Sequence, residues 1–173
     1  MAVKRASAIL GTFFFLFIAP GTVAGLIPWA ISGWQWRPAF FGEAPLRWFG
    51  GVLIILGVPI LLDSFARFAL EGFGTPAPFY PTERLIATGL YRYVRNPMYL
   101  GVLAVIGGQA LLLGDTRLIV YGVIVGFACH IFVIVYEEPE LRRRYGTQFD
   151  AYRAHVPRWL PRLTPYSGAK SLS

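Results

Sequence analysis

The chain has 173 residues, of which 55% are hydrophobic and 14% charged, with a mean hydropathy of +0.54. This composition excludes an ordinary soluble domain and predicts a membrane protein. The single cysteine, Cys129, excludes a disulfide framework and a cysteine-based zinc site. The net charge of +7 does not indicate nucleic-acid binding, because the basic residues lie mostly at the ends of apolar runs, as in membrane proteins.

Four apolar segments predict membrane-spanning helices. The first covers residues 6–31 and is read as a retained helix, with a cleaved signal peptide as the alternative. The second covers residues 48–70 and contains Asp63 and Arg67, which are four residues apart and are expected to pair, although they could instead line a substrate entrance.

The third and fourth apolar segments cover residues 98–113 and 118–136. The third is slightly short for a span. The four residues between them, 114–117, are too few for anything but an antiparallel hairpin. We therefore predict an all-α polytopic membrane protein with four transmembrane helices, a fifth being left open, and a hairpin core.

The basic residues also predict an orientation. With the N-terminus inside, the cytoplasmic pieces are residues 1–5, 71–97 and the tail after 137, and with Arg67 they hold 13 of the 16 basic residues. This asymmetry places both termini and both polar clusters on the cytoplasmic side of an inner membrane.

The stretch GLYRYVRNPMYLG, residues 89–101, opens the third helix. Asn96 is expected to cap this helix and Pro97 to occupy its first turn. Such a helix start accepts an anionic group, Arg92 and Arg95 add positive charge, and the neighbouring tyrosines offer flat faces. Lipid-headgroup anchoring by the arginines and an interfacial tyrosine belt are the plainer alternative.

Glu137 and Glu138 end the fourth helix, where carboxylates are costly unless they have partners. The hairpin returns them to the level of Arg95 and Asn96. The resulting group predicts a pocket for a zwitterion, with a glutamate holding an ammonium group and the helix start holding a carboxylate. Solvated glutamates at a helix end are the alternative.

The segments TGLYRYVRNPMYLG and YEEPELRRRYGTQFDAYRAHVPRWLP resemble the isoprenylcysteine carboxyl methyltransferase family and the phospholipid methyltransferases. The resemblance covers roughly residues 74–161. It implies an integral membrane methyltransferase that uses S-adenosylmethionine, bound under a lid formed by the C-terminal tail. With the helix-start arginine included, the expected cofactor-binding residues are Glu83, Arg84, Leu85, Ile86, Tyr91, Arg95, Asn96, Pro97, Met98, Tyr99 and Glu137.

Two positions depart from the isoprenylcysteine pattern. Asn96 stands where those enzymes usually have histidine, although the phospholipid enzymes have asparagine there. Val133 stands where the eukaryotic enzymes have a carboxylate-binding arginine, which argues against a prenylcysteine carboxylate as the acceptor. We therefore leave O-, N- and S-methylation open and expect a lipophilic acceptor that enters sideways from the bilayer.

His130 lies two turns before Glu137 and is a candidate general base. His130 and Val133 are also candidate substrate contacts. The alternative, which we favour, is a buried histidine bonded to a backbone carbonyl. No catalytic acid or base is assigned; His130, Glu138 and Arg95 are the candidates. The two histidines are too far apart in sequence to suggest a metal site.

In the tail, Leu141, Tyr145, Phe149 and Tyr152 recur at helical spacing opposite a basic face. They predict one amphipathic helix on the inner membrane surface.

We treat the chain as a single domain, with N-terminal helices over 1–70, a cofactor-binding core over 71–165 and a mobile tail over 166–173. The rival functions are a non-catalytic lipid- or partner-binding membrane protein and a small transporter. The oligomeric state is left open.

Overall fold

The computed structural model describes residues 11, 14–71 and 85–168, and within these ranges it is all-helical, without strands. Three helical stretches are long and apolar enough to cross a membrane: Phe14–Ser32, Ala44–Leu70 and Thr116–Tyr145. A shorter apolar helix spans Pro97–Leu113. The polytopic helical membrane fold expected from the sequence is therefore confirmed.

The elements follow the chain in this order: η1 (Thr22–Leu26, a π-helical turn), α2 (Ile27–Ser32), η2 (Phe40–Gly42), α3 (Ala44–Leu70), η3 (Gly89–Arg92), α4 (Pro97–Leu113), α5 (Thr116–Phe132), η4 (Val133–Glu137, a π-helical turn), α6 (Glu138–Tyr145) and α7 (Thr147–His155).

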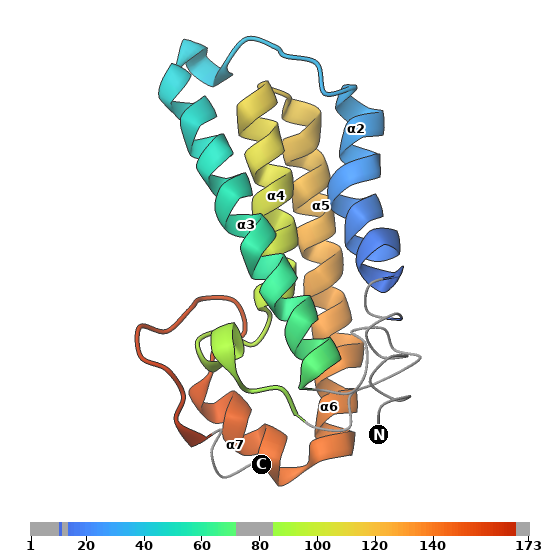
Figure 1. Cartoon of the computed structure of the whole chain (residues 1–173), viewed down its shortest axis with the longest axis vertical. Coiled ribbons are helices and arrows are strands. Elements are labelled where there is room, and N and C mark those ends of the chain that lie inside the picture. The colour runs from blue at the N-terminus through green and yellow to red at the C-terminus, as the bar shows by residue number, and fades with distance from the viewer. Residues whose placement is uncertain (1–10, 12–13, 72–84, 169–173) are drawn as a thin grey trace.

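The short helix α4 lies between α3 and α5, and α2 packs beside α5 (Figure 1). Because α4 lies in the centre of the bundle, it is covered by other helices rather than by lipid. Its residues Val102, Ile106 and Ala110 are all buried against these neighbours. At the opposite end of the bundle from α6 and α7, the predicted hairpin joins α4 to α5. Gly114 closes α4 with φ +71°, and Asp115 accepts the first-turn N–H of Arg117.

Asp115 also holds together the end of the bundle that carries the α4–α5 hairpin. Its carboxylate is 1% exposed and receives hydrogen bonds from Arg117 at 2.7 and 3.0 Å and an ion pair from Arg37 at 3.2 Å. The Arg117 guanidinium, and secondarily Arg37, hold the pKa of Asp115 below its usual range. The loop after α2 is thereby tied to the hairpin.

Pro28 explains the π-helical turn at η1 and two contacts across the bundle. A proline has no N–H for the carbonyl four residues earlier, which is Ala24, and the N–H of Ile27 bonds to Thr22 instead. The two carbonyls without a helical partner accept side-chain donors instead. Gln109 Nε2 donates to the Ala24 carbonyl at 2.7 Å, and the Tyr121 hydroxyl donates to the Val23 carbonyl at 2.8 Å. A polar group is thus satisfied inside the bundle without water.

The single tail helix predicted from the sequence is wrong in one respect. Gly146 has φ +52° and ψ −125°, a conformation that favours glycine, and it divides the segment into α6 and α7. The stripe formed by Leu141, Tyr145, Phe149 and Tyr152 packs on Ala87 and Val156 rather than on lipid. The stripe therefore holds the tail against the protein.

Glycines bring α3 and α4 into backbone contact at two heights. A methyl group added to Gly108 would come within 2.7 Å of the Gly50 carbonyl oxygen, and one added to Gly101 within 3.0 Å of the Gly57 carbonyl oxygen. Such close approach is how membrane helices gain packing energy.

We predict that Gly108→Ala lowers the stability of the protein in detergent by about 1–3 kcal/mol, because the methyl group has no room. Gly107→Ala is the matched control, because a methyl group there meets nothing within 4 Å. Thermal unfolding, monitored by size-exclusion chromatography, compares the two variants. Equal melting temperatures would show that α3 and α4 accommodate the added methyl group without loss of stability.

Candidate functional site

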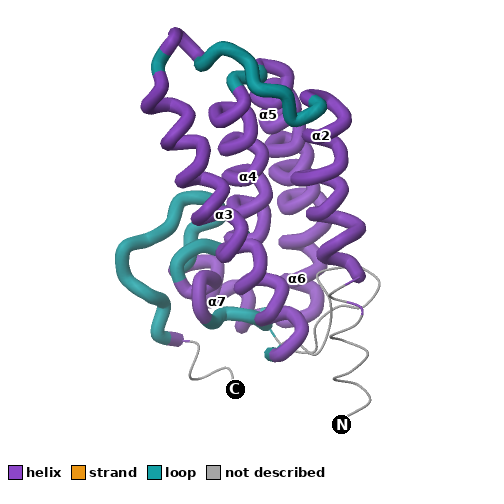
Figure 2. Tube along the Cα trace, turned by 45° about the horizontal axis from the view of Figure 1, so that its top comes forward, coloured by secondary structure: helices purple, strands orange, loops and turns teal. Residues whose placement is uncertain are grey.

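Two segments far apart in sequence meet at the end of the bundle opposite the α4–α5 hairpin: residues 85–96, here called the approach segment, and residues 156–168, here called the strap. Their backbones bond at three points: Arg95 N to Pro157 O at 2.9 Å, Arg162 N to Tyr93 O at 3.0 Å, and Tyr166 N to Arg92 O at 3.0 Å. The strap runs beside the approach segment in both views (Figure 1 and Figure 2). Backbone hydrogen bonds therefore hold the strap against the segment that leads into α4.

The approach segment is also tied to α3 and α7. Arg67 forms the expected pair with Asp63, at 2.9 and 3.0 Å, and reaches Thr88 at 3.1 Å. Tyr91 is buried, packs edge-on against Phe68 of α3, and its carbonyl accepts the Tyr152 hydroxyl at 2.6 Å. Burial raises the pKa of Tyr91, so this hydroxyl stays protonated.

Asn96 precedes Pro97, which lies in the first turn of α4 as expected, but its side chain does not cap the helix. The side-chain amide instead donates to the Arg158 carbonyl at 3.2 Å. The expected side-chain cap is therefore wrong, and Asn96 joins the helix start to the strap.

Glu138 is held by two arginines from different segments of the chain. Arg95 Nη1 lies 2.7 Å from Oε1, while Arg158 contacts Oε1 at 2.6 Å and Oε2 at 2.9 Å. Burial lowers the pKa of Arg95, and the neighbouring Glu138 carboxylate opposes this effect and keeps the ion pair charged. Two of the three candidates for acid–base chemistry, Arg95 and Glu138, are thus engaged with each other, in a contact that fixes the strap.

Glu137 has a different environment. Its Oε2 accepts the Tyr99 hydroxyl at 2.8 Å from the first turn of α4. Within the described residues, no arginine or lysine pairs with it. A partly buried carboxylate with one neutral donor retains lone pairs for a positively charged group.

Pro139 accounts for the local geometry of the two glutamates. It has no N–H for the carbonyl four residues before it, and the N–H of Glu138 bonds back to Val133, which makes η4 a π-helical turn. Glu137 then contacts α4 while Glu138 contacts the approach segment and the strap.

Within the part of the chain that the structure describes, the His130 side chain bonds to no backbone carbonyl, contrary to expectation. Its Nδ1 accepts the indole N–H of Trp159 at 2.9 Å, and the indole also lies 6.4 Å from the Tyr99 ring. His130 therefore anchors Trp159 of the strap through Nδ1.

The remaining predicted residues separate into three groups. Leu85 packs in the cluster around α6 and α7, and Met98 packs in the core between the bundle helices. Ile86 and Val133 are buried, at 8% and 1% exposure. Glu83 and Arg84 lie outside the described residues, as do residues 169–173 of the expected tail.

The strap residues Arg158 and Trp159 contact the site but were not predicted as part of it. The sequence signal was present in the Val-Pro-Arg-Trp segment. Among residues 11, 14–71 and 85–168, no group of three or more His, Cys, Asp and Glu could hold a metal ion.

Residues 46–148, more than half of the chain, match the phospholipid methyltransferase family. The chain belongs to this family. No curated protein and no solved structure matches the chain significantly. A member of this family with three membrane-length helices is an integral membrane methyltransferase, and the matched residues include the Tyr99–Glu137 pair.

We predict that Glu138→Gln loosens the strap, because the two arginines lose the charge that holds them together. The local opening free energy should fall by about 1–3 kcal/mol. Hydrogen exchange at the amides of Arg162 and Tyr166, which bond to the approach segment, measures this change.

The control for this experiment is Glu140→Gln, which removes the same charge from a carboxylate that pairs with Arg143 and Arg144 at the surface. Unchanged exchange in Glu138→Gln, or an equal increase in both variants, would contradict the assignment of Glu138 as the contact that fixes the strap.

Proposed function

We propose that this membrane methyltransferase uses S-adenosylmethionine and methylates a lipophilic acceptor that enters from the bilayer. The observation that carries the proposal is the contrast between the two adjacent glutamates. Glu138 is neutralised by two arginines, whereas Glu137 is paired only with the Tyr99 hydroxyl among the described residues.

The residues present suit the methionine part of the cofactor. The Glu137 carboxylate would hold the ammonium group, because a partly buried carboxylate that has no cationic partner among the described residues favours a cationic ligand. The first turn of α4 would receive the carboxylate of the same ligand. Tyr91 and Asn96 would shape the wall between them, beneath the strap.

When bound, the cofactor supplies a methyl group on a positively charged sulfur, which is already activated for transfer. The work left to the protein is to align the acceptor with the methyl group and to exclude water. The strap, anchored through Trp159 on His130, would cover this space. No side chain needs to act as a strong base for a neutral amine acceptor.

The acceptor side of the site is apolar. Toward the middle of the bilayer, α5 ends with Phe132, which is 40% exposed, and η4 begins with Val133, which is buried in the bundle. Burial of an acyl tail contributes little when the tail comes from lipid, so these residues would mainly orient the acceptor. The absence of an arginine at position 133 favours an amine or another neutral nucleophile over a carboxylate.

Methyl transfer from labelled S-adenosylmethionine to defined acceptors tests the reaction. We expect the purified protein in lipid vesicles to label phospholipids with amine headgroups better than prenylcysteine carboxylates, and a soluble headgroup without acyl chains least. Preference for the carboxylate would contradict the interpretation of Val133. Preference for the soluble headgroup would contradict entry from the bilayer.

We predict that Glu137→Gln weakens S-adenosylmethionine binding by about 1–3 kcal/mol, the cost of losing a charge-assisted hydrogen bond. Isothermal calorimetry in detergent measures the affinity. Glu140→Gln is the control, since it removes an equal charge outside the bundle. Equal affinity in wild type and Glu137→Gln would remove the central residue from the proposed cofactor site.

The topology is part of the proposal: the end of the bundle with Glu137 faces the cytoplasm, because 13 of the 16 basic residues belong to sequence segments that are cytoplasmic when both termini are inside. In a Cys129→Ser background, an impermeant maleimide should label Thr116→Cys in intact cells and Thr164→Cys only after lysis. Labelling of Thr164→Cys in intact cells would reverse the orientation.

A further inference from the structure

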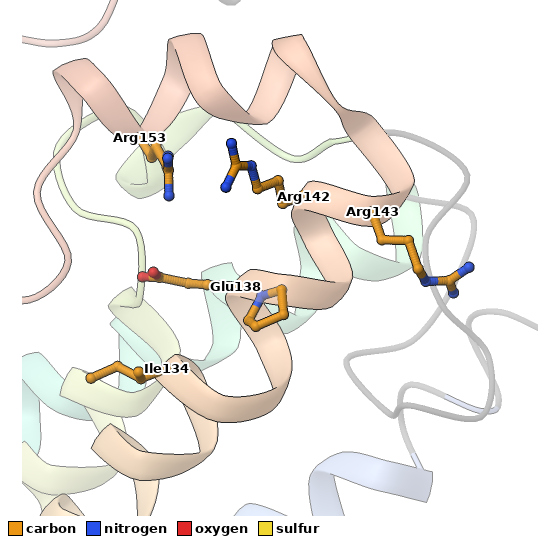
Figure 3. Close-up of a pocket in the computed structure, with 6 residues that line it drawn as sticks. Ile134, Glu138, Arg142, Arg143 and Arg153 are labelled. Carbon is orange, nitrogen blue, oxygen red and sulfur yellow. The ribbon is translucent and has the colours of Figure 1, made fainter.

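A groove of about 440 Å³ lies outside the bundle, where the long helix passes from η4 into α6 beneath α7 (Figure 3). It is separate from the Tyr99–Glu137 pair. Its lining combines one apolar residue of the membrane helix with several charged residues: Ile134, Glu138, Pro139, Arg142, Arg143 and Arg153.

The groove lies among charges that do not balance. Three carboxylates each form ion pairs with two arginines: Asp150 with Arg142 and Arg153, Glu140 with Arg143 and Arg144, and Glu138 with Arg95 and Arg158. Six guanidinium groups therefore face three carboxylates, and the cluster carries an excess of positive charge. Such a cluster attracts an anion.

Arg142 and Arg153 are the best placed to contact that anion. In Figure 3 their guanidinium groups lie in the space between α6 and α7, while Arg143 points away. Both approach the same Asp150 oxygen through Nε, at 3.3 and 3.0 Å. Their side chains are 60% and 40% exposed, so the terminal nitrogens are accessible for bidentate contacts to a phosphate.

The other end of the groove belongs to the membrane. Ile134 is one turn before Glu138 in the membrane-spanning stretch and is 41% exposed, and Val135 beside it is 70% exposed. A ligand in the groove would thus meet arginines at the membrane surface and aliphatic side chains at the level of the acyl chains. A free anion would contact only the arginines and would leave the aliphatic side chains uncovered.

We propose that this groove binds the phosphate of an anionic membrane lipid, with Arg142 and Arg153 on the phosphate and an acyl chain along Ile134. The proposal does not rest on methyl transfer, because neither arginine contacts Glu137, Tyr99 or His130 in the structure. It assigns α6 and α7 a lipid-binding role on their outer face, while their apolar stripe packs on the protein.

Native mass spectrometry of the full chain in a neutral maltoside detergent, titrated with dioleoyl phosphatidylglycerol, tests the proposal. We expect one bound lipid in the wild type. Arg142→Gln should raise its dissociation constant by about tenfold, as expected for loss of a charged contact to phosphate. Arg153→Gln should act in the same direction.

Arg144→Gln is the matched control, because it removes the same charge from the same helix but does not line the groove. Its dissociation constant should stay within about twofold of the wild type. An equal loss in Arg142→Gln and Arg144→Gln would overturn the groove as the site and leave only general charge attraction. Melting temperatures ensure that each variant is folded.

Two further titrations distinguish the source of the phosphate. Inorganic phosphate at millimolar concentration should not displace the bound lipid, and dioleoyl phosphatidylcholine should bind more weakly than phosphatidylglycerol. Displacement by inorganic phosphate would overturn a lipid site in favour of a site for free phosphate. Equal binding of the two lipids would overturn the preference for an anionic headgroup.

Discussion

The half of the molecule that contains α6 and α7 depends on one carboxylate, that of Glu138, which is shared by Arg95 and Arg158. Arg95 precedes α4 and Arg158 lies in the strap, so this single contact joins three parts of the chain that are distant in sequence. A carboxylate at the end of a membrane helix is expensive to bury unless its charge is matched. Here two guanidinium groups supply the match, and the backbone bonds between the strap and the approach segment become possible.

Matching Glu138 leaves Glu137 chemically distinct. The π-helical turn before Pro139 sends the two adjacent side chains to different partners, one to arginines and one to the Tyr99 hydroxyl. The arginines therefore leave a carboxylate next to them available for another cation. Pro28 has a comparable effect at η1, where the carbonyls it leaves over accept Gln109 and a tyrosine. In both places a proline inside an apolar helix changes hydrogen bonding rather than ending the helix.

Much of the fold could be predicted from the sequence, because apolar length and the short 114–117 connection leave few alternatives in a membrane. The pairing of Asp63 with Arg67 was also predictable, since it depends only on local helix spacing. The continuation of the last span to Tyr145 was not, because hydropathy falls at Glu137 while the backbone continues through Pro139 as a helix. The break at Gly146 was missed because the apolar stripe keeps its spacing across the glycine.

The candidate site was predicted in its nearby parts and missed in its distant ones. The hairpin brings Tyr99 to Glu137, and its geometry follows from the short connection in the sequence. Arg158 and Trp159 reach the site through a strap whose path depends on backbone bonds to the approach segment. His130 illustrates the difference, because its partner is an indole 29 positions away rather than a nearby carbonyl. Spacing along a helix carries no information about such a contact.

The two glycine contacts between α3 and α4 have a mechanical consequence. Where backbones touch, no intervening side chain can change rotamer to let one helix slide along the other, and at Gly50–Gly108 and Gly57–Gly101 the two helices are fixed at two heights. They behave as one rigid half of the molecule. If the bundle opens to admit a large molecule, the movement must therefore come from α5, which can tilt, or from the strap, which can detach. The start of α4 stays in place, and the moving parts close against it.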